Sequence, residues 1–172
     1  MNSKLLAGGA LSAALALFVW GAMAHMMLPI PEPVTPFKDG QAILNAIRAQ
    51  APHNGMYYEP RGILVAVALT PDLADKTQAM GPNLGVEFVT NVIGGVLLTL
   101  LLAWSRAKSA LGHAAIAGMI GLAGFIVIDA SYWNWYGFST AFTLQNFCDA
   151  VPGTFLAGLA AHWAVKRMKP AA

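Results

Sequence analysis

Apolar residues in this chain gather in long runs that polar residues interrupt only rarely. The longest of these runs cover residues 5–27, 83–104, 110–135 and 140–165. A helix needs about 20 mostly apolar residues to cross the hydrocarbon core of a bilayer, and each run is long enough. The pattern therefore predicts a membrane all-α protein, built as a four-transmembrane-helix bundle.

Residues at the ends of these runs fit helix boundaries. Prolines at positions 29, 31, 33 and 36 follow the first run, and proline cannot continue a helix. Gly137 after the third run is a plausible helix C-cap, and Ser139 before the fourth is a good N-cap. Pro152 lies inside the fourth run. We favour one helix that kinks there, because neighbouring helices can satisfy the carbonyl group that proline frees; the alternative is a surface helix followed by a span from Asp149.

The first run has a second interpretation. Ala22-Met23-Ala24 follows a basic start and an apolar stretch, which is the pattern of a cleavable signal peptide. The apolar run continues through His25-Met26-Met27-Leu28, however, and is long enough to span the membrane. We therefore expect an uncleaved signal anchor, whereas cleavage would leave three spans in the same orientation.

The segment 28–83, between the first two predicted spans, has the pattern of a small α+β insertion. Asp39 can cap a helix whose Ile43, Ala46 and Ile47 share one face. Residues 56–58 and 63–69 predict a β-hairpin around the turn 59–62, and residues 71–78 a short surface helix. A helix and a hairpin of this size cannot bury a full core alone, so we expect them to pack on the helix ends. The chain is predicted to divide into residues 1–27, 28–83 and 84–172.

The positions of the basic residues predict how the spans are oriented. Those close to span ends fall on one side: Lys4, Arg106, Lys108, Lys166, Arg167 and Lys169. The loop 133–138 holds none, and the basic residues of 28–83 are spread over a long segment. By the positive-inside rule, both termini are cytoplasmic and the insertion is extracytoplasmic. An interfacial aromatic belt on the outer side then comprises Tyr132, Trp133, Trp135 and Tyr136.

The composition agrees with a membrane protein and argues against other classes. Of the 172 residues, 57% are apolar and 10% charged, whereas soluble domains carry about 25% charged residues. The formal net charge is only +2, and no nucleic-acid-binding motif occurs, so we expect no nucleic acid partner. The single cysteine, Cys148, permits no disulfide within one chain. Catalytic and nucleotide-binding motifs such as G-x-S-x-G, H-E-x-x-H and the P-loop are absent from the sequence.

Polar residues inside the predicted spans are the main candidates for chemistry, because placing them in lipid is costly. They fall in the outer halves of the helices: His25, Glu87, Asn91, Asp129, Asn146 and Asp149. Asn146 and Asp149 are three residues apart and share a helix face. We expect a polar cavity in the outer leaflet that is lined by all the spans. The candidate metal ligands in it are the histidine and the three carboxylates.

A purely structural role explains most of this cluster. Glu87 lies near the N-terminus of its helix, where the macrodipole favours a carboxylate, and the asparagines can hydrogen-bond between helices. Asp129 is different, because it lies toward the C-terminal end of a continuous third helix, where a negative charge is unfavourable. It needs a partner or a proton, so both packing and binding stay open for it.

His113 and His162 form a second candidate site. They lie near the cytoplasmic ends of the third and fourth helices, at similar depth on antiparallel neighbours. Two imidazoles placed in this way can hold a haem iron axially, which makes them candidate cofactor ligands; alternatively, both lie at headgroup level and bond water or lipid. Soft ligands for copper are also present, although methionine is common in apolar helices: His25, Met26, Met27, His53 and Met56. The residues alone do not identify a cofactor.

Several stretches resemble known sequences. The run Tyr132-Trp133-Asn134-Trp135-Tyr136-Gly137-Phe138-Ser139-Thr140, the proline-ended first helix and the Met56-Tyr57-Tyr58-Glu59-Pro60 turn are similar to small four-helix proteins of the bacterial inner membrane. That group has no assigned function. The resemblance covers most of the chain, implies a multi-pass protein of the inner membrane, and transfers no catalytic residue.

Three functions are compatible with these observations. The leading hypothesis is a non-enzymatic accessory or assembly subunit whose outer domain binds a membrane protein partner, because no catalytic motif is present. The first alternative is a protein that binds a metal, haem, quinone or proton within the bundle. The second is a membrane-embedded enzyme that uses the same carboxylates and His25 for acid–base chemistry. Small residues on the first and third helices fit a compact bundle or a homo-oligomer face equally well.

Overall fold

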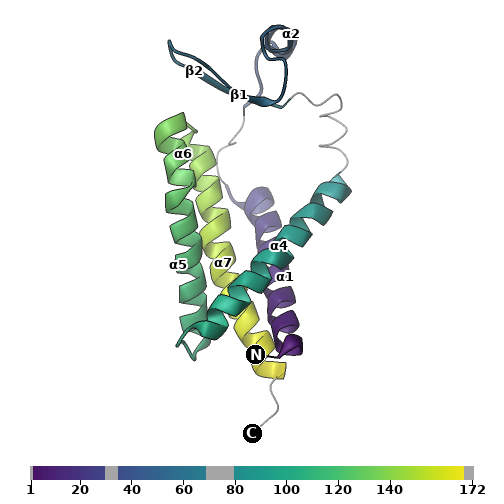
Figure 1. The fold of residues 1–172 in the computed structure, drawn as a ribbon, viewed down its shortest axis with the longest axis vertical. Coiled ribbons are helices and arrows are strands. Elements are labelled where there is room, and N and C mark those ends of the chain that lie inside the picture. Colours follow the sequence, from purple (N-terminus) through teal and green to yellow (C-terminus); the bar gives the residue numbers. More distant parts are fainter. Residues whose placement is uncertain (1, 30–34, 69–79, 169–172) are drawn as a thin grey trace. The chain divides into compact units, whose positions relative to one another are not determined.

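The computed structural model describes residues 2–29, 35–68 and 80–168, and it is mostly helical. The chain separates into two compact units: unit 1 comprises residues 1–33 and 81–172, and unit 2 comprises residues 34–80. Along the chain (Figure 1), the elements are α1 (Ser3–Met27), α2 (Gly40–Gln50), β1 (Gly55–Glu59), β2 (Ile63–Val67), α4 (Met80–Trp104), α5 (Ala110–Val127), α6 (Asp129–Tyr136) and α7 (Thr140–Met168).

Three helical segments of unit 1 are long and apolar enough to cross a membrane, counted over the described residues. They are Ser3–Met27, Gly81–Trp104 and Ala110–Tyr136, and they match the first three predicted spans. Helix α7 has 29 residues but is more polar, because its first half contains Gln145, Asn146 and Asp149. The prediction of a helical membrane protein is therefore supported by three spans, while the fourth span stays a prediction.

Local signals in the sequence place most helix ends correctly. Leu28 already has extended backbone angles, so α1 ends before the prolines that follow it. Gly137 adopts the left-handed conformation at φ +67°, as expected for a helix C-cap. Ser139 caps α7 by accepting a hydrogen bond from the backbone N–H of Phe142 at 3.1 Å. Helix α7 continues through Pro152, as predicted, and ends at Met168 rather than at Val165.

The predicted third helix is present as one candidate span, Ala110–Tyr136, and a single irregular residue divides it into α5 and α6. Ile128, between α5 and α6, departs from regular helical geometry with φ −103° and ψ −66°. The hydroxyl of Ser131 donates to the carbonyl oxygen of Val127 at 2.9 Å. A serine that bonds the carbonyl four residues earlier can bend a helix, and this one lies close to the irregular residue. Thr154 makes the same kind of bond to Ala150 inside α7 without interrupting that helix.

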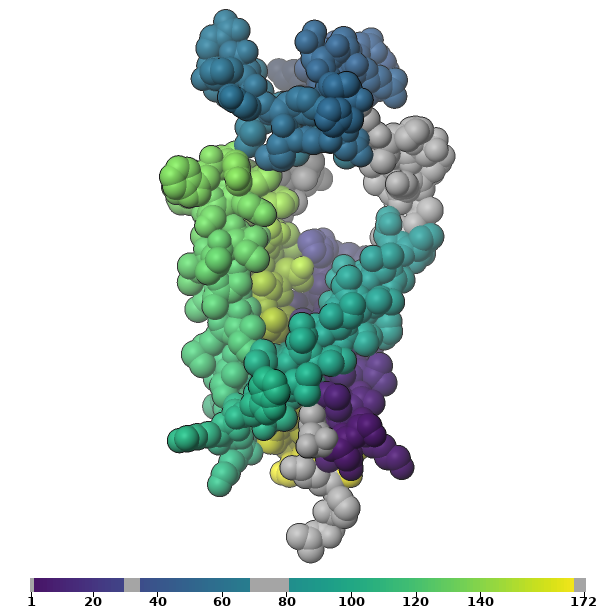
Figure 2. Space-filling model, in the orientation of Figure 1, coloured from purple at the N-terminus to yellow at the C-terminus, as the bar shows by residue number. Residues whose placement is uncertain are grey.

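Small side chains form the core of unit 1. Helices α1 and α5 both pack against α7 (Figure 1). Figure 2 shows α4 crossing the face of unit 1 that is in view. Gly95 of α4 faces the carbonyl oxygen of Ala10 so closely that a side chain there would clash. Small residues let helix backbones approach, as is common between transmembrane helices. The buried apolar cluster comprises Ala13, Leu98, Leu102, Ala117, Ala157 and Ala161.

Unit 2 contains the predicted helix and hairpin. Asp39 caps α2, because its Oδ1 accepts a hydrogen bond from the backbone N–H of Ala42 at 2.9 Å. Strands β1 and β2 pair antiparallel, from Gly55 opposite Val67 to Glu59 opposite Ile63. The second strand covers Ile63–Val67, while the predicted strand end at Leu69 and the predicted helix over 71–78 lie outside the described residues. The predicted packing of this unit on the helix ends stays a prediction.

The hairpin turn is built from a left-handed glycine and an ion pair. Gly62 has φ +123°, a conformation that other residues rarely adopt. The Arg61 guanidinium donates to Glu59 Oε1 at 2.7 Å. This hydrogen bond, with a second one from the Arg61 backbone, lowers the pKa of the Glu59 carboxyl. The pair is exposed, so its contribution to stability is small.

Replacing Gly158 by alanine should destabilise unit 1. The added Cβ would lie 2.7 Å from the Cβ of Ala117 and 2.9 Å from the carbonyl oxygen of His113, so α7 must move away from α5. Overpacking of this kind costs about 1–3 kcal/mol. Gly124→Ala is the matched control, because a Cβ there meets no described atom within 4 Å. Thermal unfolding in mild detergent checks the difference, and equal melting temperatures for the two variants would contradict the close packing of α5 on α7.

Candidate functional site

The polar residues predicted to line one outer cavity form separate pairs. Asn146 Nδ2 of α7 donates to Asp129 Oδ1 of α6 at 2.8 Å. His25 Nε2 of α1 lies 3.5 Å from Asp149 Oδ2 of α7. On α4, Asn91 Nδ2 donates to Glu87 Oε1 at 3.1 Å, within the same helix. The structure therefore joins Asp129 to Asn146 and His25 to Asp149, and it pairs Glu87 with a residue of its own helix.

The break at Ile128 changes the interpretation of Asp129. The sequence places this residue toward the end of one long helix, but in the structure Asp129 is the first residue of α6. The start of a helix favours a carboxylate, and the hydrogen bond from Asn146 gives Asp129 the partner that it needs. Both observations favour a packing role for this carboxylate over a role in binding an ion.

Two further polar contacts join α1 to α7, and the sequence analysis did not find them. Proline has no N–H, so Pro152 leaves the carbonyl group of Cys148, four residues earlier, without its helical donor. Trp20 Nε1 donates to this carbonyl oxygen at 2.8 Å. Gln145 Nε2 donates to the carbonyl oxygen of Ala24 at 3.2 Å, in the last turn of α1, where carbonyl groups also lack helical donors.

A metal site gains no support from this geometry. Among the residues that the structure describes, no group of three His, Cys, Asp or Glu side chains could hold a metal ion. The predicted ligands His25, Glu87, Asp129 and Asp149 belong to the separate pairs described above. The residues considered for copper are divided between the two units, since His25, Met26 and Met27 lie in unit 1 while His53 and Met56 lie in unit 2.

His113 and His162 do meet, as their predicted depths require. His113 is in the first turn of α5 and His162 near the end of α7, and their Nδ1 atoms are 2.9 Å apart. The ring centroids lie 5.0 Å apart with an edge-to-face geometry. Two imidazole nitrogens that bind a haem iron from opposite faces are about 4 Å apart, because each metal–nitrogen bond is about 2 Å long. The facing nitrogen atoms therefore bond one another, and this arrangement does not fit a haem iron between them.

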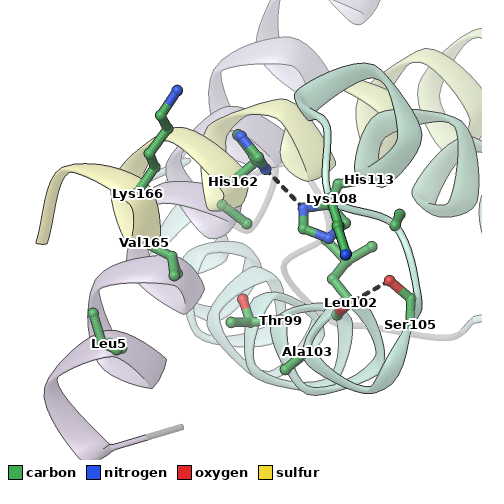
Figure 3. Close-up of a pocket in the computed structure, with 12 residues that line it drawn as sticks. Leu5, Thr99, Leu102, Ala103, Ser105, Lys108, His113, His162, Val165 and Lys166 are labelled. Carbon is green, nitrogen blue, oxygen red and sulfur yellow. Dashed lines mark hydrogen bonds between the residues drawn. The ribbon is translucent and has the colours of Figure 1, made fainter. Parts of the chain in front are cut away.

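A cavity of about 590 Å³ adjoins the two histidines. It lies where α1 begins, α7 ends and the short connection 105–109 joins α4 to α5. Figure 3 shows His113 and His162 pointing toward one another, with Lys166 pointing away from them. Its lining combines apolar and polar residues: Leu5, Thr99, Leu102, Ala103, Ser105, Ala107, Lys108, His113, Ala161, His162, Val165 and Lys166.

The predicted aromatic belt corresponds to α6. All four of its rings are exposed on the described chain, Tyr132, Trp133, Trp135 and Tyr136, and Trp135 is the most open at 79%. Trp133 Nε1 donates to Thr140 Oγ1 at 3.4 Å, across the turn that leads into α7. Exposed amphipathic rings in one short helix fit a position at the membrane interface, which stays a prediction.

Comparison of the chain with models of protein families, with curated proteins and with solved structures finds no match. The resemblance to small bacterial inner-membrane proteins therefore stays a prediction. The structure is that of a helical protein with three candidate membrane spans among its described residues.

Removing the indole N–H of Trp20 should destabilise the contact between α1 and α7. Trp20→Phe leaves the carbonyl oxygen of Cys148 without a donor, and an unsatisfied buried acceptor costs about 1–3 kcal/mol. In a Pro152→Ala background the helix regains its own N–H donor, so the same substitution should cost less. Thermal unfolding of the four combinations gives the coupling energy. Trp163→Phe is an exposed control, and a coupling energy of zero would contradict this assignment.

Proposed function

We propose that this chain is an integral membrane protein with four spans that acts as a non-enzymatic accessory or assembly subunit, and that unit 2 contacts its partner protein. Helix α7 is the proposed fourth span. Its 29 residues, at 1.5 Å each, reach about 43 Å, enough to cross a bilayer. Its polar half is compatible with lipid because Gln145, Asn146 and the carbonyl group freed by Pro152 all have partners.

The arrangement of the helix ends supports a common side for both termini. The start of α1, the end of α7 and the connection between α4 and α5 lie at the same end of unit 1 (Figure 1). A Cβ on Gly9 would lie 3.1 Å from Val165 Cγ2, which brings the first and last helices together there. Lys4, Arg106, Lys108 and Lys166 occupy this end, so the positive-inside rule favours a cytoplasmic location for it. For a bacterial protein, this membrane would be the inner membrane.

An uncovered apolar face of the hairpin carries the proposal of a partner. Side chains alternate across a strand, so Met56 and Tyr58 of β1 share a face with Leu64 and Ala66 of β2, which are their partners in register. All four residues are exposed, and 78% of the Tyr58 surface is accessible to solvent. The opposite face is better covered, since Tyr57, Val65 and Val67 are half-buried. Contiguous exposed apolar surface of this kind is typical of a protein-binding site.

The backbone of the hairpin offers a second means of contact. Its sheet has two strands, so each strand has one edge whose N–H and C=O groups face no other strand of this sheet. A partner can add an extended segment to such an edge and fill the adjacent apolar face with its own side chains. Helix α2 buries none of its residues, so it does not close this surface.

A photo-crosslinking residue at position 58, in the full-length protein in native membranes, tests the partner proposal. We expect a discrete protein adduct. Leu64→Ser should lower its yield about tenfold, because burying a leucine contributes about 1.5–3 kcal/mol. The control is the same probe at Gln41 on α2, an exposed polar position. Adducts with lipid alone, or equal yields at positions 58 and 41, would contradict the proposal.

A small-ligand protein is the second candidate, and the carboxylate pairs within the proposed spans favour it. The substitution Asp129→Asn distinguishes a role in ligand binding from a role in packing. The asparagine side chain loses the negative charge but keeps an oxygen that can accept the hydrogen bond from Asn146. We expect the melting temperature and the adduct at position 58 to be preserved, while Asp129→Ala should cost about 0.5–1.5 kcal/mol. If Asp129→Asn keeps its melting temperature but loses the adduct, a role for Asp129 in binding a proton or an ion replaces the packing role.

A further inference from the structure

The cavity beside the histidine pair has an amphipathic lining that the proposed function does not use. One part of its wall is apolar and includes Leu5, Leu102 and Val165, which come from three different helices. Another part carries His113 and His162 (Figure 3). With a volume of about 590 Å³, the cavity can admit a polar headgroup together with part of an apolar chain.

The charges around this cavity favour an anion. Lys108 and Lys166 line it, and no aspartate or glutamate is among the described residues of its lining. The Lys166 ammonium lies 5.2 Å from the centre of the Trp163 ring and points away from the two histidines (Figure 3), so it adds positive charge near the cavity without pointing at them. Lys108 comes from the short connection between α4 and α5. A basic pocket between helices at the cytoplasmic end is the kind of site that binds anionic headgroups.

Thr99 supplies an independent indication of a ligand. It lines the cavity from α4 and is only 3% exposed. Among the described residues, its Oγ1 has no hydrogen-bond partner in the protein. A buried hydroxyl without a partner is unfavourable, so a hydrogen-bonding group inside the cavity would stabilise it.

The histidine pair adds hydrogen-bonding capacity to the same wall. In the contact between the two Nδ1 atoms, one imidazole donates and the other accepts. The Nε2 atom of His113 is not used in this contact, so it can donate to or accept from a group in the cavity, depending on the tautomer. Hydroxyl, imidazole and ammonium donors are the groups that bind phosphate oxygens.

From these observations we propose that the cavity binds the phosphate group of an anionic phospholipid. The phosphate oxygens would bond the Thr99 hydroxyl, the histidine pair and Lys108, while the start of an acyl chain would lie along Leu5, Leu102 and Val165. Free phosphate has the same anionic oxygens but no apolar part, so the apolar wall favours the lipid. This proposal concerns unit 1 and is independent of the hairpin.

Titration of the full-length protein in mild detergent with three probes tests the site. The probes are phosphatidylglycerol, phosphatidylcholine and inorganic phosphate, and native mass spectrometry with thermal unfolding measures binding. We expect phosphatidylglycerol to bind at least tenfold more tightly than either of the others. Equal affinity for the two lipids would overturn the preference for an anion, and equal affinity for inorganic phosphate would overturn the lipid as the ligand.

Two substitutions assign the binding to this cavity. Lys108→Gln and Thr99→Val should each weaken phosphatidylglycerol binding about fivefold. Lys4→Gln is the matched control, because Lys4 is exposed at the same end of unit 1 but does not line the cavity. Thr99→Val should not lower the melting temperature of the lipid-free protein, since its hydroxyl has no protein partner to lose. If Lys108→Gln and Lys4→Gln bind the lipid equally well, the site is overturned.

Discussion

The carbonyl group of Cys148 and the indole of Trp20 determine how the first helix meets the last. Pro152 removes the helical donor of this carbonyl group, so the carbonyl group needs a donor from a neighbouring helix. Trp20 replaces the missing donor at 2.8 Å, and Gln145 returns a hydrogen bond of 3.2 Å to the carbonyl oxygen of Ala24 in α1. Two bonds in opposite directions fix the rotation and the height of α1 against α7. A Cβ on Gly153 would lie 3.1 Å from the Trp20 ring, so the glycine next to the proline makes room for it.

Packing through alanine and glycine follows from the same close approach. No large side chain is fully buried in the described part of the chain. Large apolar residues such as Leu11 and Leu15 of α1 are instead exposed, at 53% and 56%. Exposed large apolar side chains are unfavourable in water but common in lipid. In lipid, helices are held together by close backbone contact rather than by the burial of apolar side chains. Unit 2 has no comparable core, since helix α2 buries none of its residues.

The sequence predicts the features that depend on local signals and on long apolar runs. These include three candidate spans, the caps at Asp39, Gly137 and Ser139, the hairpin turn, and the meeting of His113 with His162. It does not predict the break at Ile128, because no proline or glycine occurs in the stretch 125–129 that contains it. The carboxylates occur in separate pairs because helix rotation decides which faces meet. The Trp20 contact had a usable signal: a carbonyl group freed by proline needs a donor from a neighbour, and tryptophan can only donate.

The contacts between α1 and α7 join residues that are 121 and 128 positions apart in the chain. Helix α1 is synthesised before α7, so these contacts form only after α7 has been made. Helix α1 is apolar enough to stay in a bilayer alone. Helix α7 contains a carbonyl group freed by Pro152 and the side-chain amides of Gln145 and Asn146, and all three form hydrogen bonds with neighbouring helices. If α7 is a span, as proposed, its stable integration is a step of tertiary folding, because it depends on contacts with helices that are synthesised before it.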